Sequence, residues 1–298
     1  MNTHDTSSSK RLYRTLTSPQ WGEKIDPKSC SVIVCNRTGG QGKTLITQLI
    51  ALAFEEVGIS KFLASADSST ADALSKLGKI HRGSVLELGI GAEFDAVRSD
   101  SSKVVSHWDQ LGSILASGNA LVDIGANLVD TVWNWAHARN AGEVLRSAKA
   151  PQIVLVVPVR AQAQAIEDAL AVLERSIRED AFLPIAARIL VLNEASGGFE
   201  RYGSSGDFER LSAMKHNAGL KIVRLPQCRS EIWPSLERNY TPLRSIIPMT
   251  TQDVAQEFHL DMFAASGARA DLLQWISHAI ESFRVAGLIP LEQGGGDE

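Results

Sequence analysis

Residues 31–54 of this chain read SVIVCNRTGGQGKTLITQLIALAF. The stretch opens with SVIVC at 31–35, a short apolar run rich in Val and Ile that is typical of a buried strand. A turn containing three glycines follows, and after it Leu45, Leu49 and Leu52 recur at the spacing of one helix face. The pattern predicts a strand, a glycine-rich turn and an amphipathic helix in direct succession.

This succession is the context that a phosphate-binding loop requires. Glycines let the backbone wrap with its N–H groups pointing inward, and the positive end of the helix dipole adds to the attraction for phosphate. Lys43 provides a point charge for the β- and γ-phosphates, and the Thr44 hydroxyl provides a ligand for Mg²⁺. We therefore expect ATP or ADP to bind here together with Mg²⁺. The predicted nucleotide contacts in the loop are Gly39, Gly40, Gln41, Gly42, Lys43, Thr44 and Leu45.

The composition is that of an ordinary globular protein. Of the 298 residues, 44% are apolar and 21% are charged, and the net charge of −4 argues against a uniformly basic surface that coats nucleic acid. The three cysteines, Cys30, Cys35 and Cys228, include no CxxC pair, which indicates a reduced, cytoplasmic protein with all three near the core. The seven histidines show no HxxxH or HxH spacing, so a zinc site is not indicated. No window approaches 18 uncharged apolar residues, and a membrane span is not expected.

Further short apolar runs recur along the chain without polar alternation, as is typical of strands buried on both faces of a parallel sheet. Amphipathic stretches with helical spacing cover 44–57 and 162–178, and a last helix is expected over 270–286. Strand followed by helix, repeated, predicts a doubly wound α/β domain with a mostly parallel sheet flanked by helices, whose ligand lies beyond the carboxyl ends of the strands. The predicted strands are 31–35, 61–66, 120–124, 152–158, 187–193 and 221–226.

The ends of the chain differ from the middle. Residues 1–28 are polar and rich in Ser and Thr, which predicts a flexible N-terminal extension. Residues 289–298 read as an acidic, glycine-rich tail. Between them, 29–288 is expected to form a single domain of the phosphate-loop NTPase type.

The loop sequence NRTGGQGKT resembles the deviant Walker A loop of the ParA/MinD ATPases, which is typically Lys-Gly-Gly-x-Gly-Lys-Thr and is often preceded by Asn-Gln. Asn36, the three glycines, Lys43 and Thr44 match that pattern. Thr38 stands where the family usually has a signature lysine, which reaches across a nucleotide-sandwich dimer to the partner's phosphate. Arg37, one residue earlier, is a candidate substitute for that lysine.

The resemblance extends over residues 31–250 and implies further site residues. KFLASADSST sits where the family has a strand ending in Asp-x-Asp-Pro-Gln, which implies that Asp67 positions the attacking water. NALVDIGANLVDT resembles the strand ending in Asp-x-Pro-Pro, which implies that Asp123 is the Walker B carboxylate near Mg²⁺. An aspartate that closes an apolar strand is also costly to bury unless it is paired, and a hydrated cation would pair it. The expected catalytic residues are Lys43, Asp67 and Asp123, and the expected Mg²⁺ ligands are Thr44 and Asp123.

Two later segments resemble elements that hold the base. RILVLNEA places Asn193 where a base-contacting Asn commonly ends a strand, and an Asn amide can both donate to and accept from the adenine edge. KIVRLPQCRSEIW resembles the segment that covers the base, with Pro226 and Arg229 in the corresponding places.

The resemblance implies an ATP-dependent homodimer that acts with a partner protein which stimulates or reads its nucleotide state. Our first hypothesis is an ATPase for plasmid or DNA partition, conjugative transfer or intracellular positioning, with slow or partner-stimulated hydrolysis because the signature lysine is absent. The alternative is an ATP-binding adaptor of a secretion or transfer apparatus with little or no hydrolysis. An ATP-dependent ligase or an iron–sulfur carrier on the same scaffold is a third reading, but a substrate motif or a cysteine pair for it is lacking.

Two further partners of such ATPases are DNA and membranes. The terminal helix has few cations and leads into an acidic tail, which disfavours membrane docking. Non-specific DNA binding stays open through arginines of the second half of the chain, namely Arg201, Arg210, Arg224, Arg238 and Arg244.

Overall fold

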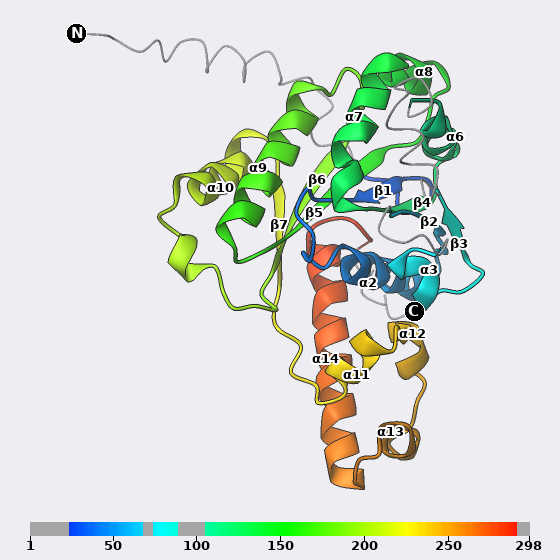
Figure 1. Ribbon diagram of the computed structural model, residues 1–298, viewed down its shortest axis with the longest axis vertical. Coiled ribbons are helices and arrows are strands. Elements are labelled where there is room, and N and C mark those ends of the chain that lie inside the picture. The colour runs from blue at the N-terminus through cyan, green and yellow to red at the C-terminus, as the bar shows by residue number, and fades with distance from the viewer. Residues whose placement is uncertain (1–23, 68–73, 89–104, 291–298) are drawn as a thin grey trace, which may run out of the picture.

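A computed structural model describes residues 24–67, 74–88 and 105–290 of the chain. At its centre lies a seven-stranded sheet with the order β3-β2-β4-β1-β5-β6-β7. Every neighbouring pair of strands runs parallel, and helices lie on either side of the sheet (Figure 1). The strands are β1 (Ser31–Val34), β2 (Phe62–Ala66), β3 (Val85–Glu87), β4 (Ala120–Ile124), β5 (Ile153–Arg160), β6 (Ala187–Asn193) and β7 (Lys221–Leu225).

Two hydrophobic cores, one on each face of the sheet, explain why the strands show no polar alternation. Successive residues of β1 point to opposite faces, so Ile33 packs in one core while Val32 and Val34 pack in the other. Both faces therefore select apolar residues, as parallel sheets covered by helices require. The first core receives residues from α6 (Asp109–Ser117), α7 (Val129–Ala138), α8 (Ala141–Ser147), α9 (Ala163–Arg178) and α10 (Gly206–Asn217). The second receives residues from α2 (Lys43–Glu56), α11 (Trp233–Arg238), α12 (Leu243–Ile246), α13 (Thr251–Phe258) and α14 (Met262–Val285).

The doubly wound α/β fold expected from the sequence is confirmed, and each of the six predicted strands forms within two residues of its predicted bounds. The remaining elements are α3 (Lys76–Ile80) and the 3₁₀ turns η1 (Ala126–Leu128) and η2 (Glu200–Tyr202). Strand β3 was not predicted, because it has three residues that are all half-buried and gives no apolar run. Cys30 and Cys35 are buried and Cys228 is half-buried, which agrees with the near-core placement expected for the three cysteines.

The last helix is longer than predicted. It begins at Met262 rather than near residue 270, because the Asp261 side chain accepts hydrogen bonds from the backbone N–H groups of Phe263 and Ala264 and caps the helix there. This first turn projects beyond the sheet (Figure 1), and Phe263 is 92% exposed. The early turns contribute only the small buried side chains Ala265 and Ala268 to the core, and these give a weaker periodic signal than the large apolar residues that follow.

The two ends of the chain fall largely outside the described residues, so the expected N-terminal extension and C-terminal tail remain predictions. Leu288 and Ile289 follow α14 and are buried, which keeps the chain packed through residue 289. Across the three described ranges, no helix combines the length and the apolar character that a membrane crossing demands.

Strand order brings the ends of β1, β2 and β4 together at one edge of the sheet. In the register of the sheet, Asp123 is level with Val34 of β1 and with Ser65 of β2. Asp67 follows the end of β2 directly. The carboxylates that the sequence pointed to therefore lie beside the glycine-rich turn that follows β1.

Candidate functional site

The turn after β1 is shaped by glycines in the left-handed backbone region. Gly40 has φ +73° and Gly42 has φ +87°, values that other residues rarely adopt. Gly42 also caps α2, and its carbonyl accepts the first helical hydrogen bond from the Ile46 N–H at 2.9 Å. A Cβ added at Gly42 would lie 2.5 Å from Nδ2 of Asn193. Backbone conformation and close packing thus both demand glycine at this position.

Side-chain amides hold this turn against the neighbouring strands. Asn193 Nδ2 donates to the Gln41 carbonyl at 3.0 Å, and Gln41 Oε1 accepts from the Arg160 N–H at 2.7 Å. Asn36 Nδ2 donates to the Pro158 carbonyl at 2.8 Å. The turn is therefore fixed to the ends of β5 and β6 before any ligand binds, which is the preorganisation that anion binding by backbone N–H groups needs.

Lys43, Thr44 and Asp123 form the polar centre of the site. Lys43 Nζ donates to the Thr38 carbonyl at 3.1 Å, and the Thr44 hydroxyl donates to Asp123 Oδ2 at 2.7 Å. Burial raises the pKa of Asp123 to about 6, although the hydrogen bond from Thr44 and the charge of Lys43 oppose the rise. Burial also lowers the pKa of Lys43. The Asp123 carboxylate and the Thr44 hydroxyl together offer two oxygen ligands. This pair fits a hydrated Mg²⁺, because Mg²⁺ binds few protein ligands and keeps waters and phosphate oxygens in its other positions.

Metal sites built from protein side chains alone require a larger donor cluster. The described ranges contain no group of three or more His, Cys, Asp or Glu side chains placed to hold a metal ion.

These groups open into a cavity of about 570 Å³, which is within the usual range for small-molecule sites. The turn, Asp67 and Asp123 form its polar side. Residues of α11, α12 and the segment between them form its other wall, with Trp233, Leu236 and Tyr240 prominent. A polar floor for phosphates and a largely apolar wall for a base suit a nucleotide.

Most of the residues predicted for the site line this one cavity. They are Gly39, Gly40, Gln41, Gly42, Lys43, Thr44, Leu45, Asp67 and Asp123.

Asn193 and Pro226, two of the residues expected at the base, lie elsewhere. Asn193 is 1% exposed, and its amide is committed to the turn instead of facing the cavity. The Pro226 carbonyl accepts a hydrogen bond from Trp275 Nε1 at 2.7 Å, which fastens the segment after β7 to α14. Neither residue is among those that line the cavity. The geometry of the cavity therefore does not bring either residue to the space expected for the base.

Several cavity residues escaped the sequence analysis, among them Gln48, Lys76, Arg160 and Tyr240. Arg160 ends the apolar strand β5, and that position was a usable signal. Lys76 and Tyr240 lie in short polar segments whose sequence gives no hint of the cavity. The Gln48 side chain accepts from the Leu243 N–H at 3.2 Å and so joins α2 to the apolar wall.

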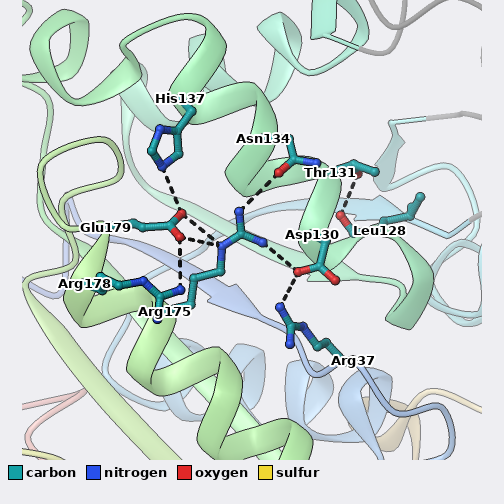
Figure 2. Close-up of polar contacts among 9 residues, drawn as sticks. All are labelled: Arg37, Leu128, Asp130, Thr131, Asn134, His137, Arg175, Arg178 and Glu179. Carbon is teal, nitrogen blue, oxygen red and sulfur yellow. Dashed lines mark hydrogen bonds and ion pairs between the residues drawn. The ribbon is translucent and has the colours of Figure 1, made fainter.

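Thr38, at the position of the missing signature lysine, and the preceding Arg37 both contact neighbouring helices. The Thr38 hydroxyl donates to Asp168 on α9. Arg37 forms an ion pair with Asp130 on α7 at 2.5 Å, and Arg175 on α9 reaches the same carboxylate oxygen at 2.7 Å. Figure 2 shows Asp130 between the two arginines, with Arg37 approaching from the turn. In this arrangement Arg37 is not among the residues that line the cavity.

The same cluster continues along α7 and α9. Arg175 also donates to Glu179 and to Asn134, and His137 contacts Glu179 at 3.2 Å (Figure 2). Arg175 and Glu179 are only 16% and 13% exposed, so this pair is screened less than a surface ion pair. The turn is thereby linked by charge to two helices on one face of the sheet.

Solved structures of other proteins are similar to this chain in topology, at low sequence identity. No protein-family model matches the chain, and no curated protein matches it by sequence. Among solved structures, a ParA family ATPase of Chlorobium tepidum TLS is similar at 15% identity over 82% of this chain and 98% of that chain, with a TM-score of 0.44.

Two further solved structures match at a TM-score of 0.40. The MinC:MinD cell division protein complex of Aquifex aeolicus has 16% identity over 90% of this chain and 100% of that chain. A Cyanothece McdA variant in complex with ATP has 12% identity over 84% of this chain and 96% of that chain. The assignment to the phosphate-loop NTPase fold rests on the strand order and the geometry of the turn.

The glycine requirement can be tested on stability alone. We expect Gly42→Ala to lower the free energy of unfolding by about 1–3 kcal/mol, because alanine is strained at this φ and its Cβ meets Asn193. Gly39→Ala is the matched control, since its Cβ meets nothing within 4 Å and its φ is not in the left-handed region, and it should stay within about 0.5 kcal/mol of wild type. Urea unfolding measures both variants. Equal stability of the two would contradict the strain argument.

The buried carboxylate predicts a pH-dependent gain in stability for Asp123→Asn. The folded-state pKa of Asp123, about 6, lies above the ordinary aspartate value of 3.8. The folded state thus binds this proton more tightly, and the charged group destabilises the nucleotide-free protein as pH rises from about 4 through 6. At pH 7.5 the variant should be about 1–3 kcal/mol more stable, and the gain should vanish near pH 4.

Urea unfolding between pH 4 and 7.5 gives the readout for this variant. Asp271→Asn, which removes an exposed carboxylate on α14, is the control and should show no such trend. A gain that did not change with pH would refute the assignment to burial of the charge.

Proposed function

We propose that this chain is a ParA/MinD-like ATPase that binds ATP with Mg²⁺ at the turn formed by residues 39–44. The observation that carries the proposal is the convergence of Lys43, Thr44 and Asp123 at the start of α2, beside left-handed glycines and inside a cavity with an apolar wall. Anions bind at such helix starts because unpaired N–H groups and the helix dipole point at them.

Hydrolysis would proceed by in-line attack of water on the γ-phosphate. The N–H groups of the turn and Lys43 hold the β- and γ-phosphates, and Lys43 exchanges its contact with the Thr38 carbonyl for one with phosphate. Thr44 and Asp123 hold Mg²⁺, which when bound neutralises charge on the phosphate oxygens. Asp67 orients the attacking water. These assignments extend the sequence resemblance to residues that line one cavity.

In this proposal ATP binding drives formation of a homodimer that a partner protein reads or stimulates. The process served is partition of plasmid or other DNA, conjugative transfer or intracellular positioning. Hydrolysis is slow without the partner, because position 38 carries a threonine that donates to Asp168 instead of a lysine.

The contacts of Thr38 and Arg37 also favour a second candidate function. With Thr38 bound to α9 and Arg37 paired with Asp130, the turn offers no cation from the signature position. A protein of this kind could use nucleotide binding as a structural switch with little turnover. This second candidate is an ATP-binding adaptor of a secretion or transfer apparatus.

Three of the five arginines considered for DNA binding form ion pairs. Arg210, Arg224 and Arg244 pair with Glu174, Glu194 and Glu55, respectively, which reduces the positive charge that they present. A partition function would therefore need DNA to compete for these arginines or to use others, and the binding would weaken steeply with salt.

The proposal is tested by Lys43→Ala. Wild type should bind ATP with Mg²⁺, form a dimer in ATP but not in ADP, and release phosphate. Lys43→Ala should weaken ATP binding and lower any phosphate release by at least about 10²-fold, because it removes the charge at the transferred phosphate. Titration calorimetry, a phosphate-release assay and analytical ultracentrifugation measure these quantities, with duplex DNA as an added variable.

Lys215→Ala, which removes an exposed lysine on α10, is the matched control and should behave as wild type. Tight ATP binding and dimerisation without phosphate release would favour the adaptor. Absence of nucleotide binding by wild type would overturn the proposal as a whole.

A further inference from the structure

The cavity contains a lysine that the sequence resemblance does not account for. Lys76 is the first residue of α3, and its side chain lines the same cavity as Lys43, Thr44, Asp67 and Asp123. Burial lowers the pKa of Lys43, and the like charge of Lys76 lowers it further. The charge of Lys76 also acts on Asp123, where it opposes the rise in pKa that burial causes. Lys76 therefore shares one cavity with both charged groups of the polar centre.

The other positively charged side chains near the turn differ in where they lie and in what they contact. Arg37 is paired with Asp130, outside the residues that line the cavity. Lys43 lies at the base of the turn, where the β- and γ-phosphates are expected. Arg160 lines the cavity, and its Nε is buried without a hydrogen-bond partner. Lys76 and Arg160 thus remain as the cations that could approach the terminal phosphate.

Sheet topology separates these two candidates. Asp123 is the penultimate residue of β4 and Asp67 follows β2, and both strands lie on one side of β1. Lys76 belongs to the connection between β2 and β3 and is therefore on that same side. Arg160 ends β5, on the opposite side of β1. The metal ligand and the residue expected to position water mark the γ-phosphate side of the cavity, which is the side of Lys76.

The segment that carries Lys76 is held in place from the sheet. The Glu87 carboxylate of β3 accepts from both the N–H and the hydroxyl of Ser75, at 3.2 and 3.0 Å. The Ser75 hydroxyl in turn accepts from the Gly78 N–H at 2.9 Å and caps α3. Among the residues that the structure describes, none forms an ion pair with Lys76. Its backbone is fixed, and its ammonium group is available to a ligand.

We propose that Lys76 contacts the γ-phosphate of ATP bound in the same subunit and supplies the cation that is missing at Thr38. The inference rests on the proposed ATPase function. In the hydrolysis step a bond forms between the water oxygen and the γ-phosphorus, and the bond from that phosphorus to the β–γ bridging oxygen breaks. The electron pair leaves on ADP, the water loses its proton to phosphate or solvent, and Lys76 stays protonated while it stabilises the equatorial oxygens.

The test compares ligands that differ only at the γ position. Lys76→Ala should leave ADP affinity within about twofold of wild type but weaken binding of ADP with aluminium fluoride, a mimic of the transferring phosphoryl group, by about 10²-fold or more. Phosphate release should fall by a similar factor, and Lys76→Arg should restore part of both. Calorimetry and a phosphate-release assay provide the readouts, and urea unfolding shows whether the variants remain folded.

Two comparisons make the assignment falsifiable. Lys215→Ala controls for loss of a lysine and should match wild type. Arg160→Ala should affect ADP and ADP–aluminium fluoride to the same extent, because the topology places it away from the γ-phosphate. The assignment would be overturned if Arg160→Ala lost more affinity for ADP–aluminium fluoride relative to ADP than Lys76→Ala does. It would also be overturned if Lys76→Ala lost the same affinity for both ligands.

The outcome also separates the two proposals. If wild type binds ADP and Lys76→Ala binds ADP–aluminium fluoride as tightly as wild type does, the proposed role of Lys76 is wrong while the nucleotide site stands. If wild type releases no phosphate, the selectivity for ADP–aluminium fluoride still decides the role of Lys76. If wild type binds no nucleotide, the proposed function fails first and the role of Lys76 fails with it.

Discussion

The hydrogen bond from the Thr44 hydroxyl to the buried Asp123 carboxylate joins the two elements on which the site depends. It couples the first turn of α2 to the end of β4 at 2.7 Å, across the strand order that places β4 beside β1. A carboxylate that is 6% exposed carries a desolvation cost that one hydroxyl offsets only in part, as its raised pKa shows. The nucleotide-free site therefore favours additional positive charge beside Asp123, which the proposed Mg²⁺ would supply.

Side-chain amides, more than charged side chains, hold the turn around this pair in place. Asn36, Gln41 and Asn193 hold its backbone to the ends of β5 and β6, and glycine at position 42 lets Asn193 approach. Because these amides make their contacts within the protein, the N–H groups of the turn can be presented to phosphate without rearrangement. Rigid donors aimed at developing charge are the main source of catalytic power in reactions of this class.

Two residues that depart from the resembling family, Arg37 and Thr38, lie on one side of the turn. Thr38 and Arg37 bind α9 and α7 through Asp168 and Asp130, and Arg175 connects these two helices. Any ligand that moved the turn would have to act against this cluster. The fold thus couples the turn to the helices that cover one face of the sheet, while residues of α11 and α12 form the other wall of the cavity.

The sequence by itself determined the strand, turn and helix of residues 31–56 and the parallel sheet, because apolar runs and glycine positions report local backbone constraints. The placement of Asp123 near the turn came from the family resemblance and depends on β4 lying beside β1. Only the tertiary structure decided that Asn193 lies beneath the turn and that Pro226 is fastened to α14. It alone also brought Lys76, Arg160 and Tyr240 to the cavity. The physical reason is that such contacts join residues far apart in the chain. Which strand ends become neighbours depends on the strand order, and no local pattern in the sequence encodes that order.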